Sequence, residues 1–347
     1  MEKISFKTLP ILLLLTVLTF SFSFVTPVLA KQKVVGVSNL WLGNDWNARC
    51  NQTIVEYFEK KGYKVISSNA GQGGTPQQKA DVENFISMKV DGIVIKGGEG
   101  DAFLDVSKKA WEANIPVVTV IMFLPYAVHN SVEDSWQGST NLAVWLVNQM
   151  RGSGKYIGMD AAGWHTLEVR KRAYGEVLRW FPEIEMIGKY HEVNPADPVN
   201  NAYKITKATL RAHPDLKGVA TTWGLPAVGA IKAIKEMKKE KQVSVISIDQ
   251  EAALLAQMHT PDCPATAVVG IEPIVQGTAA AKALEAAMGF KTVQEAKANL
   301  PTLSVIGVSY VGTKDVDMDV FKPKKVYKSV DACWDGNFSA TTLKKPW

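Results

Sequence analysis

The order of hydrophobic and polar positions predicts that strands and helices alternate along most of this chain. Short apolar runs, typical of strands buried on both faces, are separated by longer segments in which apolar residues recur every three or four positions, as in amphipathic helices. The predicted strands cover residues 34–37, 63–67, 92–95, 116–121, 156–159, 186–190, 218–221, 243–248 and 303–308. The predicted helices cover residues 44–61, 76–88, 101–113, 135–150, 168–181, 198–211, 226–238, 251–258 and 275–288.

This alternation predicts an α/β protein with two doubly wound parallel-sheet, Rossmann-like domains. The small polar stretch Arg151–Lys155 separates two successive sets of strands and helices and is interpreted as a crossing linker. Helix 275–288 and strand 303–308 have no set of their own, so they must rejoin the existing domains and the chain must cross the hinge more than once. We therefore assign the N-terminal lobe to residues 31–151 and 271–302, and the C-terminal lobe and tail to residues 152–270 and 303–347.

Two such domains predict a ligand clamp. Open α/β sheets bind ligands in the crevice at the carboxyl ends of their strands, so two facing sheets form a cleft with a hinge. The glycine-rich segments 71–74 and 97–100 lie at predicted strand ends. Neither has the spacing of a phosphate-binding loop or of a dinucleotide fingerprint, and we interpret both as turns.

The first 30 residues have the pattern of a secretory signal peptide. Lys3 and Lys7 precede an apolar run over residues 9–25, and Val28 and Ala30 are small residues at the two positions that signal peptidase recognises. The run is shorter than the roughly 20 residues that a membrane-spanning helix prefers, which disfavours an uncleaved anchor. We expect export to the periplasm, with cleavage after Ala30.

The composition agrees with an exported globular protein. The chain has 347 residues, of which 46% are hydrophobic and 21% are charged, and this length suits two domains of roughly 150 residues. The net charge is +5, and the longest basic stretch, residues 232–241, is interrupted by Glu236 and Glu240. The basic residues therefore form no groove-sized cluster, and we expect no nucleic-acid partner.

Export gives the three cysteines, Cys50, Cys263 and Cys333, the chance to form a disulfide. Cys50 falls within a predicted helix and is expected to be a buried thiol. Cys263 lies between two prolines in a predicted loop and Cys333 lies in the C-terminal tail, so these two are the better pair. Spacing alone does not determine the connectivity.

Several stretches, taken in their order and spacing, resemble a type I periplasmic solute-binding protein of the ribose-binding kind, the receptor component of ABC importers. The matching stretches are residues 34–38, 61–63, 90–95, 114–118, 212–219 and 245–249, and the resemblance covers roughly residues 33–310. The resemblance implies capture of a small polar ligand, a sugar or sugar-like compound, by hinge closure and its delivery to an ABC permease. It also implies a monomer with no cofactor and no enzymatic activity.

The resemblance further implies which polar residues face the ligand. Asp134 matches an acidic residue that ends a strand and binds ligand hydroxyls, and Asp249 matches the acid that follows the strand 245–248. A helix N-cap is the structural alternative for both aspartates. Arg170 matches an arginine that reaches into the cleft from the second domain, with an exposed helix residue as its alternative. Such charged groups would bind the polar edge of a ligand.

The aromatic part of the expected site begins at the first helix. The family has a stacking aromatic residue at this helix start, where the chain carries Asn44, Trp46 and Asn47. We also predict that Trp41, Trp164 and Trp223 lie at strand-to-helix turns facing the cleft. For each tryptophan the alternative is ordinary packing or a surface position.

Two departures from the sugar-binding pattern leave the ligand open. Trp223-Gly224 stands where sugar-binding relatives usually have Asn-Asp, and Gly270 stands where a polar amide is common. The pocket is therefore expected to be unusually aromatic, which suits a sugar stacked on both faces or a methylated amine held by cation–π contacts.

Two other functions are compatible with this fold. A periplasmic sensor of trimethylamine N-oxide shares it and acts on a membrane histidine kinase, so a sensing subunit that presses on a kinase ectodomain is the main alternative. An exported enzyme that uses the same cleft is another. The five histidines have no metal-ligand spacing, and no nucleophile motif occurs, so we expect neither a metal site nor catalysis.

Overall fold

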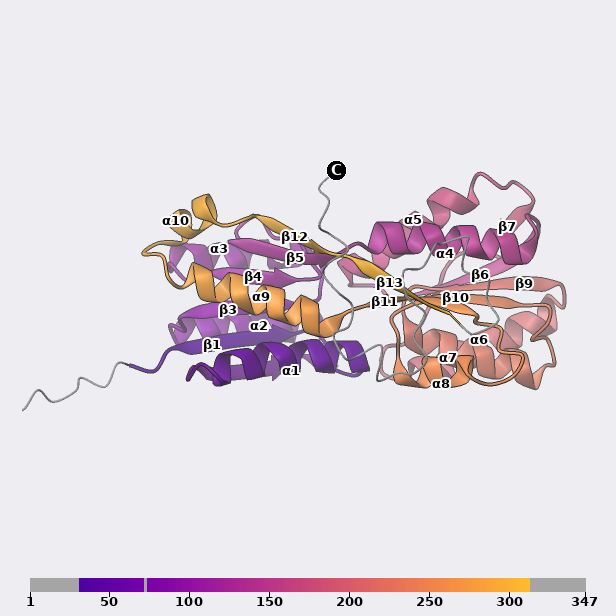
Figure 1. The fold of residues 1–347 in the computed structure, drawn as a ribbon, viewed down its shortest axis with the longest axis horizontal. Coiled ribbons are helices and arrows are strands. Elements are labelled where there is room, and N and C mark those ends of the chain that lie inside the picture. Colours follow the sequence, from indigo (N-terminus) through magenta and orange to yellow (C-terminus); the bar gives the residue numbers. More distant parts are fainter. Residues whose placement is uncertain (1–30, 72–73, 313–347) are drawn as a thin grey trace, which may run out of the picture. The chain divides into compact units, whose positions relative to one another are not determined.

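Two β-sheets organise the residues that the computed structural model of this protein describes, 31–71 and 74–312 (Figure 1). Each sheet is the centre of one lobe. No helix within these residues is long and apolar enough to cross a membrane. The predicted signal peptide and the chain after residue 312 lie outside the described residues. Cleavage after Ala30 and the pairing of Cys263 with Cys333 therefore stay predictions.

The first lobe contains a sheet of six parallel strands in the order β12-β5-β4-β3-β1-β2. These strands are β1 (Val34–Asn39), β2 (Lys64–Asn69), β3 (Gly92–Lys96), β4 (Val117–Val120), β5 (His129–Glu133) and β12 (Leu303–Ile306). Its helices are α1 (Asp45–Glu59), α2 (Gly74–Ser87), the 3₁₀ turn η2 (Gly100–Phe103), α3 (Leu104–Glu112), α9 (Pro273–Ala287) and α10 (Val293–Asn299). Every residue of β3, β4 and β5 is buried, as in a parallel sheet covered on both faces.

The second lobe contains a sheet of seven strands in the order β13-β11-β10-β9-β6-β7, with the short strand β8 beside β6. These strands are β6 (Gly154–Asp160), β7 (Ile184–Met186), β8 (His191–Glu192), β9 (Leu216–Thr221), β10 (Ser244–Ile248), β11 (Ala267–Ile271) and β13 (Val308–Gly312). Its helices are α4 (Ser135–Met150), α5 (His165–Leu178), α6 (Pro198–Ala212), α7 (Gly224–Glu236) and α8 (Ala252–Met258). Only β13 runs antiparallel to its neighbour, among the strand pairs described.

Three single residues connect the lobes. Asp134 lies between β5 and α4, Glu272 between β11 and α9, and Gly307 between β12 and β13. The expected α/β class, the two Rossmann-like sheets and the multiply crossed hinge are thus confirmed. Such short connections limit the relative movement of the lobes to rotation about a few backbone positions.

The structure places two of the three crossings away from the predicted lobe boundaries. Helix α4, assigned from sequence to the N-terminal lobe, packs against α5 and strand β10 of the second lobe. The segment Arg151–Lys155 is therefore not a linker between lobes. Its residues Arg151 and Gly152 have φ values of 56° and 74° and turn the chain from α4 into β6.

The second shifted crossing splits a predicted strand. The segment 303–308, assigned from sequence to the C-terminal lobe, is two strands on either side of Gly307. β12 pairs with β5 in the first lobe, and β13 pairs with β11 in the second. An apolar run shows that a segment is buried, but it does not show which sheet the segment joins.

The polar strand β5 was absent from the predicted elements, as were β11 and helix α10. β5 reads His129-Asn130-Ser131-Val132-Glu133, which lacks an apolar run. Its buried polar groups have partners in neighbouring segments. His129 hydrogen-bonds through Nδ1 to the carbonyl of Pro301 at 2.6 Å, and Asn130 Oδ1 accepts from Thr119 Oγ1 at 2.8 Å. Such partners make a polar strand compatible with a buried position.

Candidate functional site

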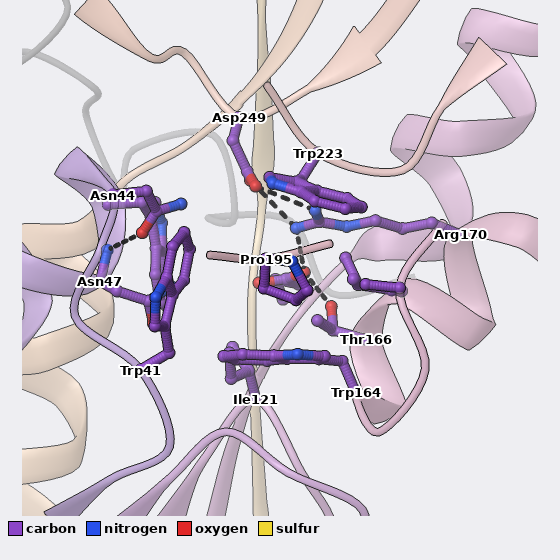
Figure 2. Close-up of a pocket in the computed structure, with 14 residues that line it drawn as sticks. Trp41, Asn44, Asn47, Ile121, Trp164, Thr166, Arg170, Pro195, Trp223 and Asp249 are labelled. Carbon is purple, nitrogen blue, oxygen red and sulfur yellow. Dashed lines mark hydrogen bonds and ion pairs between the residues drawn. The ribbon is translucent and has the colours of Figure 1, made fainter. Parts of the chain in front are cut away.

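A cavity lies at the carboxyl ends of strands from both lobes, the position at which open α/β sheets bind ligands (Figure 2). The first lobe contributes segments that follow β1 and β4 and the end of β5. The second lobe contributes segments that follow β6, β8, β9 and β10, together with the first turns of α5. The lining residues are Trp41, Asn44, Trp46, Asn47, Ile121, Glu133, Ala161, Trp164, Thr166, Leu167, Arg170, Pro195, Trp223 and Asp249.

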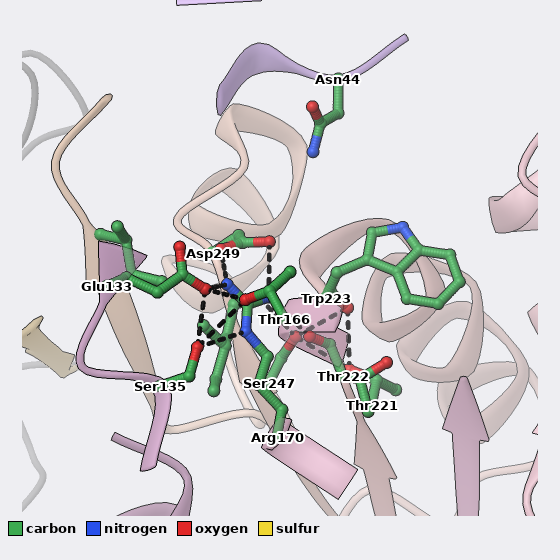
Figure 3. Close-up of polar contacts among 12 residues, drawn as sticks. Asn44, Glu133, Ser135, Thr166, Arg170, Thr221, Thr222, Trp223, Ser247 and Asp249 are labelled. Atoms are coloured by element: carbon green, nitrogen blue, oxygen red, sulfur yellow. Dashed lines mark hydrogen bonds and ion pairs between the residues drawn. The ribbon is translucent and has the colours of Figure 1, made fainter. Parts of the chain in front are cut away.

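Arg170 is the centre of the polar part of this cavity (Figure 3). Its side chain is 2% exposed and donates to both oxygens of Asp249, at 3.0 and 3.1 Å. It also donates to Glu133 Oε1 at 2.5 Å. Asp249 belongs to the second lobe and Glu133 to the first, so the guanidinium joins the lobes through an ion pair on each side.

The remaining donors of Arg170 are also occupied. Nη1 donates to the carbonyl of Thr222 at 2.7 Å, and Nε donates to Ser135 Oγ at 3.3 Å. A guanidinium has five N–H groups, and the five bonds use all of them. In this closed arrangement, a ligand hydroxyl can reach Arg170 only by displacing one of these partners.

Burial and ion pairing together influence the protonation of the charged groups in this cluster. Burial by itself lowers the pKa of Arg170, but the negative charges of Asp249 and Glu133 outweigh that effect and raise the pKa, so the guanidinium stays protonated. Two carboxylates surround one cation, so the cluster formally has one negative charge in excess, although burial raises the pKa of Asp249 against the effect of Arg170. Thr166 Oγ1 donates to Glu133 Oε1, while no described residue hydrogen-bonds to Glu133 Oε2. That oxygen is available to a ligand donor.

Tryptophan rings supply much of the apolar surface of the cavity. Trp41 and Trp164 meet edge to face, with ring centroids 6.4 Å apart and an interplanar angle of 79°. Trp41 comes from the first lobe and Trp164 from the second. Trp164 also packs over Gly97 in the first lobe, where a Cβ would lie 2.8 Å from the ring and φ is +76°. A glycine is therefore required beneath this ring.

The two asparagines at the start of α1 are already partly occupied. Asn44 is the N-cap of α1: its Oδ1 accepts from the Asn47 N–H at 2.9 Å, and its Nδ2 donates to Glu251 at 2.7 Å. Asn47 Oδ1 accepts from Lys96 Nζ at 2.5 Å. Lys96 is 1% exposed, and burial lowers the pKa of Lys96 to about 8. Of the polar atoms in these two side chains, only the amide nitrogen of Asn47 has no hydrogen-bond partner among the described residues.

The structure brings all the residues predicted from sequence to this cavity except one. Trp41, Asn44, Trp46, Asn47, Trp164, Arg170, Trp223 and Asp249 line it. Asp134 does not line the cavity: it caps α4, and its side chain accepts from the Gln137 N–H at 3.1 Å. The preceding residue, Glu133, occupies the expected acidic position, because adjacent residues at a strand end point in different directions.

Glu133, Thr166 and Lys96 are contributors that the sequence analysis missed. The signal for Glu133 and Lys96 is their place as the last residues of β5 and β3. Thr166 lies in the first turn of α5, close to the predicted Trp164 and Arg170. Locating these residues requires exact strand ends, which hydrophobic periodicity leaves uncertain by a few residues.

A second cavity adjoins the first behind Trp164 and Ala161, which line both. It has a volume of about 240 Å³ and is lined by Glu99 of the first lobe and by Asp160, Glu168, Lys171, Tyr190 and Glu192 of the second, among others. By the same measure, the first cavity is smaller, with a volume of about 40 Å³. No group of three or more His, Cys, Asp or Glu residues suited to a metal ion occurs in the described part of the chain.

The comparisons with known proteins agree with this architecture. A family model described as a periplasmic binding protein domain matches residues 35–292. The D-apiose import binding protein of Paraburkholderia graminis is 27% identical over 177 residues, which are 48% of this chain and 54% of that protein. The match thus spans about half the length of that relative. The galactofuranose-binding protein YtfQ of Escherichia coli is 25% identical over 281 residues, 77% of this chain and 86% of that protein.

Solved structures share the fold. An ABC transporter solute-binding protein from Agrobacterium vitis, with bound allitol, superposes with a TM-score of 0.76 at 22% identity, covering 84% of this chain and 99% of that one. An ABC sugar transporter subunit from Rhodobacter sphaeroides gives a TM-score of 0.75 at 20% identity, covering 82% and 99%. At such identities the likeness shows the fold and not the ligand.

Proposed function

Because the chain belongs to the periplasmic binding protein domain family, we propose that it captures a sugar or a sugar-like polyol in the cavity between its lobes and delivers it to an ABC permease. The observation that supports this most directly is the cluster of Glu133, Arg170 and Asp249, in which charged groups of both lobes meet beside tryptophan rings. A ligand bound there would contact both lobes at once.

The chemistry of the lining suits a hydroxylated ring. The C–H faces of a sugar are apolar and pack on tryptophan, while its hydroxyls both donate and accept hydrogen bonds. A hydroxyl inserted between Glu133 and Arg170 would donate to the carboxylate and accept from the guanidinium, and charge-assisted bonds of this kind are the stronger ones. The unpartnered amide nitrogen of Asn47 offers one further donor.

Ligand entry requires the lobes to part. The contacts of Trp41 with Trp164 and of Arg170 with Glu133 hold the lobes together at this cavity, so a sugar would enter an open form and be enclosed when the lobes rotate about Asp134, Glu272 and Gly307. A ligand that contacts both lobes binds the closed form more tightly and so increases its population. The permease would then recognise the closed lobes, and neither a cofactor nor a catalytic step is needed.

This function places the protein outside the cytoplasmic membrane. We propose that residues 1–30 direct export to the periplasm and are removed after Ala30, and that the mature protein acts as a monomer. Cys50 and Cys263 are both buried and are not bonded to each other. The disulfide between Cys263 and Cys333 is part of this proposal.

A methylated amine is the second candidate ligand, and two observations favour it. The cavity has tryptophans in both lobes, and the cluster around Arg170 has one negative charge in excess. Aromatic rings and nearby carboxylates attract a quaternary or tertiary ammonium group. With such a ligand, the protein would serve as a sensing subunit for a membrane kinase.

Calorimetric titration separates these ligands. The protein, unfolded and refolded to remove any ligand carried through purification, is titrated with D-apiose, galactofuranose, D-arabinose, allitol, myo-inositol and trimethylamine N-oxide. Binding of one of the sugars or polyols at micromolar or lower Kd, lost in Glu133→Gln, supports the proposed function. Binding of the amine alone overturns it in favour of the sensor.

A further inference from the structure

Two helix starts contact each other across the lobes at the edge of the cavity. Asp45 is the first residue of α1 in the first lobe, and Ala252 is the first residue of α8 in the second. The Asp45 N–H donates to Glu251 Oε2 at 3.2 Å, and the Ala252 N–H donates to Asp45 Oδ2 at 2.9 Å. Asn44 Nδ2 adds a third bond, to Glu251 Oε1, at 2.7 Å. We call these four residues the latch.

The bonds of the latch are reciprocal. The first N–H groups of a helix have no acceptor within the helix, and a helix start favours a nearby carboxylate. Here Glu251 of the second lobe accepts from the start of α1, and Asp45 of the first lobe accepts from the start of α8. Each lobe thus supplies the acceptor that the other lobe lacks.

Glu251 is buried in the closed form. It is 1% exposed, and a Cβ at Gly224 would lie 2.4 Å from its Cγ, so the glycine at the start of α7 makes room for it. Asp249 and Asp45 are the charged groups that face it. Burying a carboxylate next to two others is unfavourable unless donors compensate, and the compensating donors, Asn44 and the Asp45 N–H, come from the other lobe.

A third helix start is satisfied across the lobes at a separate place. His165 is the first residue of α5 in the second lobe, and its N–H donates to the carbonyl of Gly98 in the first lobe at 3.3 Å. This bond shares no residue with the latch. It therefore reports separately whether the lobes are together.

We propose that Asp45 and Glu251 are positioning residues that hold the two lobes together in the closed form. Asn44 belongs to this contact and not to the ligand contacts, since both polar atoms of its side chain are already bonded. The proposal goes beyond sugar binding, and because its test uses no ligand, its failure would leave the proposed function intact.

Amide hydrogen exchange, followed residue by residue by NMR on the ligand-free protein, tests the latch. We expect the N–H groups of Asp45, Ala252 and His165 to be protected, although helix-start amides usually exchange fast. In Glu251→Ala, exchange at Ala252 and His165 should become at least tenfold faster. Their own acceptors, Asp45 and Gly98, are intact in this variant, so the acceleration measures the parting of the lobes and not the loss of one bond.

Glu99→Ala is the matched control. Glu99 is an exposed carboxylate at the second cavity for which no side-chain hydrogen bond or ion pair occurs among the described residues, and its removal should leave all three amides unchanged. Asp45→Ala should accelerate exchange at His165 as Glu251→Ala does, and the double variant should add little, because either change alone opens the latch.

Two results would overturn the proposal. One is an absence of protection at the three amides in the unaltered protein; the other is acceleration confined to Asp45 in Glu251→Ala. Strand β3 serves as the folding reference in the same spectra. If Glu251→Ala loses protection there, Asp45→Ala replaces it; unchanged exchange at His165 in that variant would likewise refute the latch.

Discussion

The lobes are joined by two kinds of contact that differ in their physical basis. The latch consists of directional hydrogen bonds between carboxylates and helix starts. The second contact, near Trp164, is aromatic: Trp41 meets Trp164, and Phe123 meets His165 edge to face with centroids 5.0 Å apart and an angle of 89°. In Figure 2, Asp249, which leads into the latch, is drawn above Arg170, and Trp164 is drawn below it. Polar contacts specify one closed geometry, whereas apolar contacts stabilise closure without strict direction.

The difference also concerns pH. Glu251 titrates and is faced by two other acids, so the latch depends on its protonation. The aromatic contact includes His165, but burial lowers the pKa of His165 below its usual value. That ring is therefore neutral at neutral and alkaline pH. Of the two contacts between the lobes, the latch is therefore the one that should respond to pH in this range. The variants below separate the two contacts on that basis.

The largest effect is expected from removing the side chain of Arg170, the centre of the polar cluster. Arg170→Ala leaves Glu133 and Asp249 buried without their cation, which costs about 3–5 kcal/mol. We expect a Tm lower by several degrees and loss of measurable ligand binding, checked by calorimetry. Arg172→Ala is the control on the same helix: that side chain is 71% exposed and pairs with Glu168, and its removal should change little. A wild-type Tm for Arg170→Ala would contradict the buried ion pairs.

The pH dependence of binding follows from Glu251. Burial, with the charges of Asp249 and Asp45, raises the pKa of Glu251 from 4.5 to about 8 in the closed form. An open form exposes the side chain and returns the pKa toward its usual value, so the closed form binds the proton more tightly. Closure, and with it affinity for the sugar found by titration, should fall as pH rises toward about 8 and level off above it, by at most about tenfold per pH unit.

Glu251→Gln is the control for this pH profile. Lys96, with its pKa lowered by burial to about 8, and Glu272, with its pKa raised by burial to about 7, titrate in the same window. Both remain in the variant. Titration calorimetry from about pH 6 to pH 9 should give a flatter profile for Glu251→Gln than for the unaltered protein; equal profiles would assign the dependence to the other two groups.

A smaller effect is expected at the aromatic contact. Gly97→Ala adds a methyl group against Trp164, and an aromatic pair is worth about 0.5–1.5 kcal/mol. Gly188 also has a positive φ, +68°, but a Cβ there meets no atom within 4 Å. Gly188→Ala thus carries the backbone strain without the ring displacement. Exchange at the His165 N–H should accelerate more in Gly97→Ala than in Gly188→Ala, and equal rates would show that Trp164 does not hold the lobes.

The smallest effect on binding is expected at Asp134. Asp134→Ala removes the N-cap of α4, which costs about 0.5–2 kcal/mol of stability. Ligand affinity should stay within a factor of two, since the side chain does not line the cavity. Glu133→Gln, one residue earlier, should show the reverse pattern, with weaker binding and a smaller change in Tm. Measurements of Tm and ligand affinity together decide which of the two acids contacts the ligand. Weakened binding in Asp134→Ala would show that Asp134 belongs to the binding site.

The sequence analysis placed residues at the cavity where local pattern and family likeness coincide, and their roles in ligand binding stay predictions. Trp46, Arg170 and Asp249 were placed at the starts or first turns of helices, and all three line the cavity. Asp134 failed by one position, because a strand end allows only one of two adjacent acids to point into the cavity. Asn44 does line the cavity, but its Oδ1 caps α1 and its Nδ2 donates to Glu251 of the other lobe.

By itself, the sequence determined the alternation of strands and helices, because this depends on side chains near one another along the chain; it also predicted an export signal and an aromatic cleft. Only the tertiary structure decided which sheet each crossing segment joins, that Glu133 and not Asp134 faces Arg170, and that Asn44 meets Glu251, 207 positions away. These outcomes depend on how two independently patterned lobes come together. The carboxylates of Asp45 and Glu251 are ordinary surface residues in sequence, and they become a latch only when each accepts the unpaired N–H of the opposite lobe.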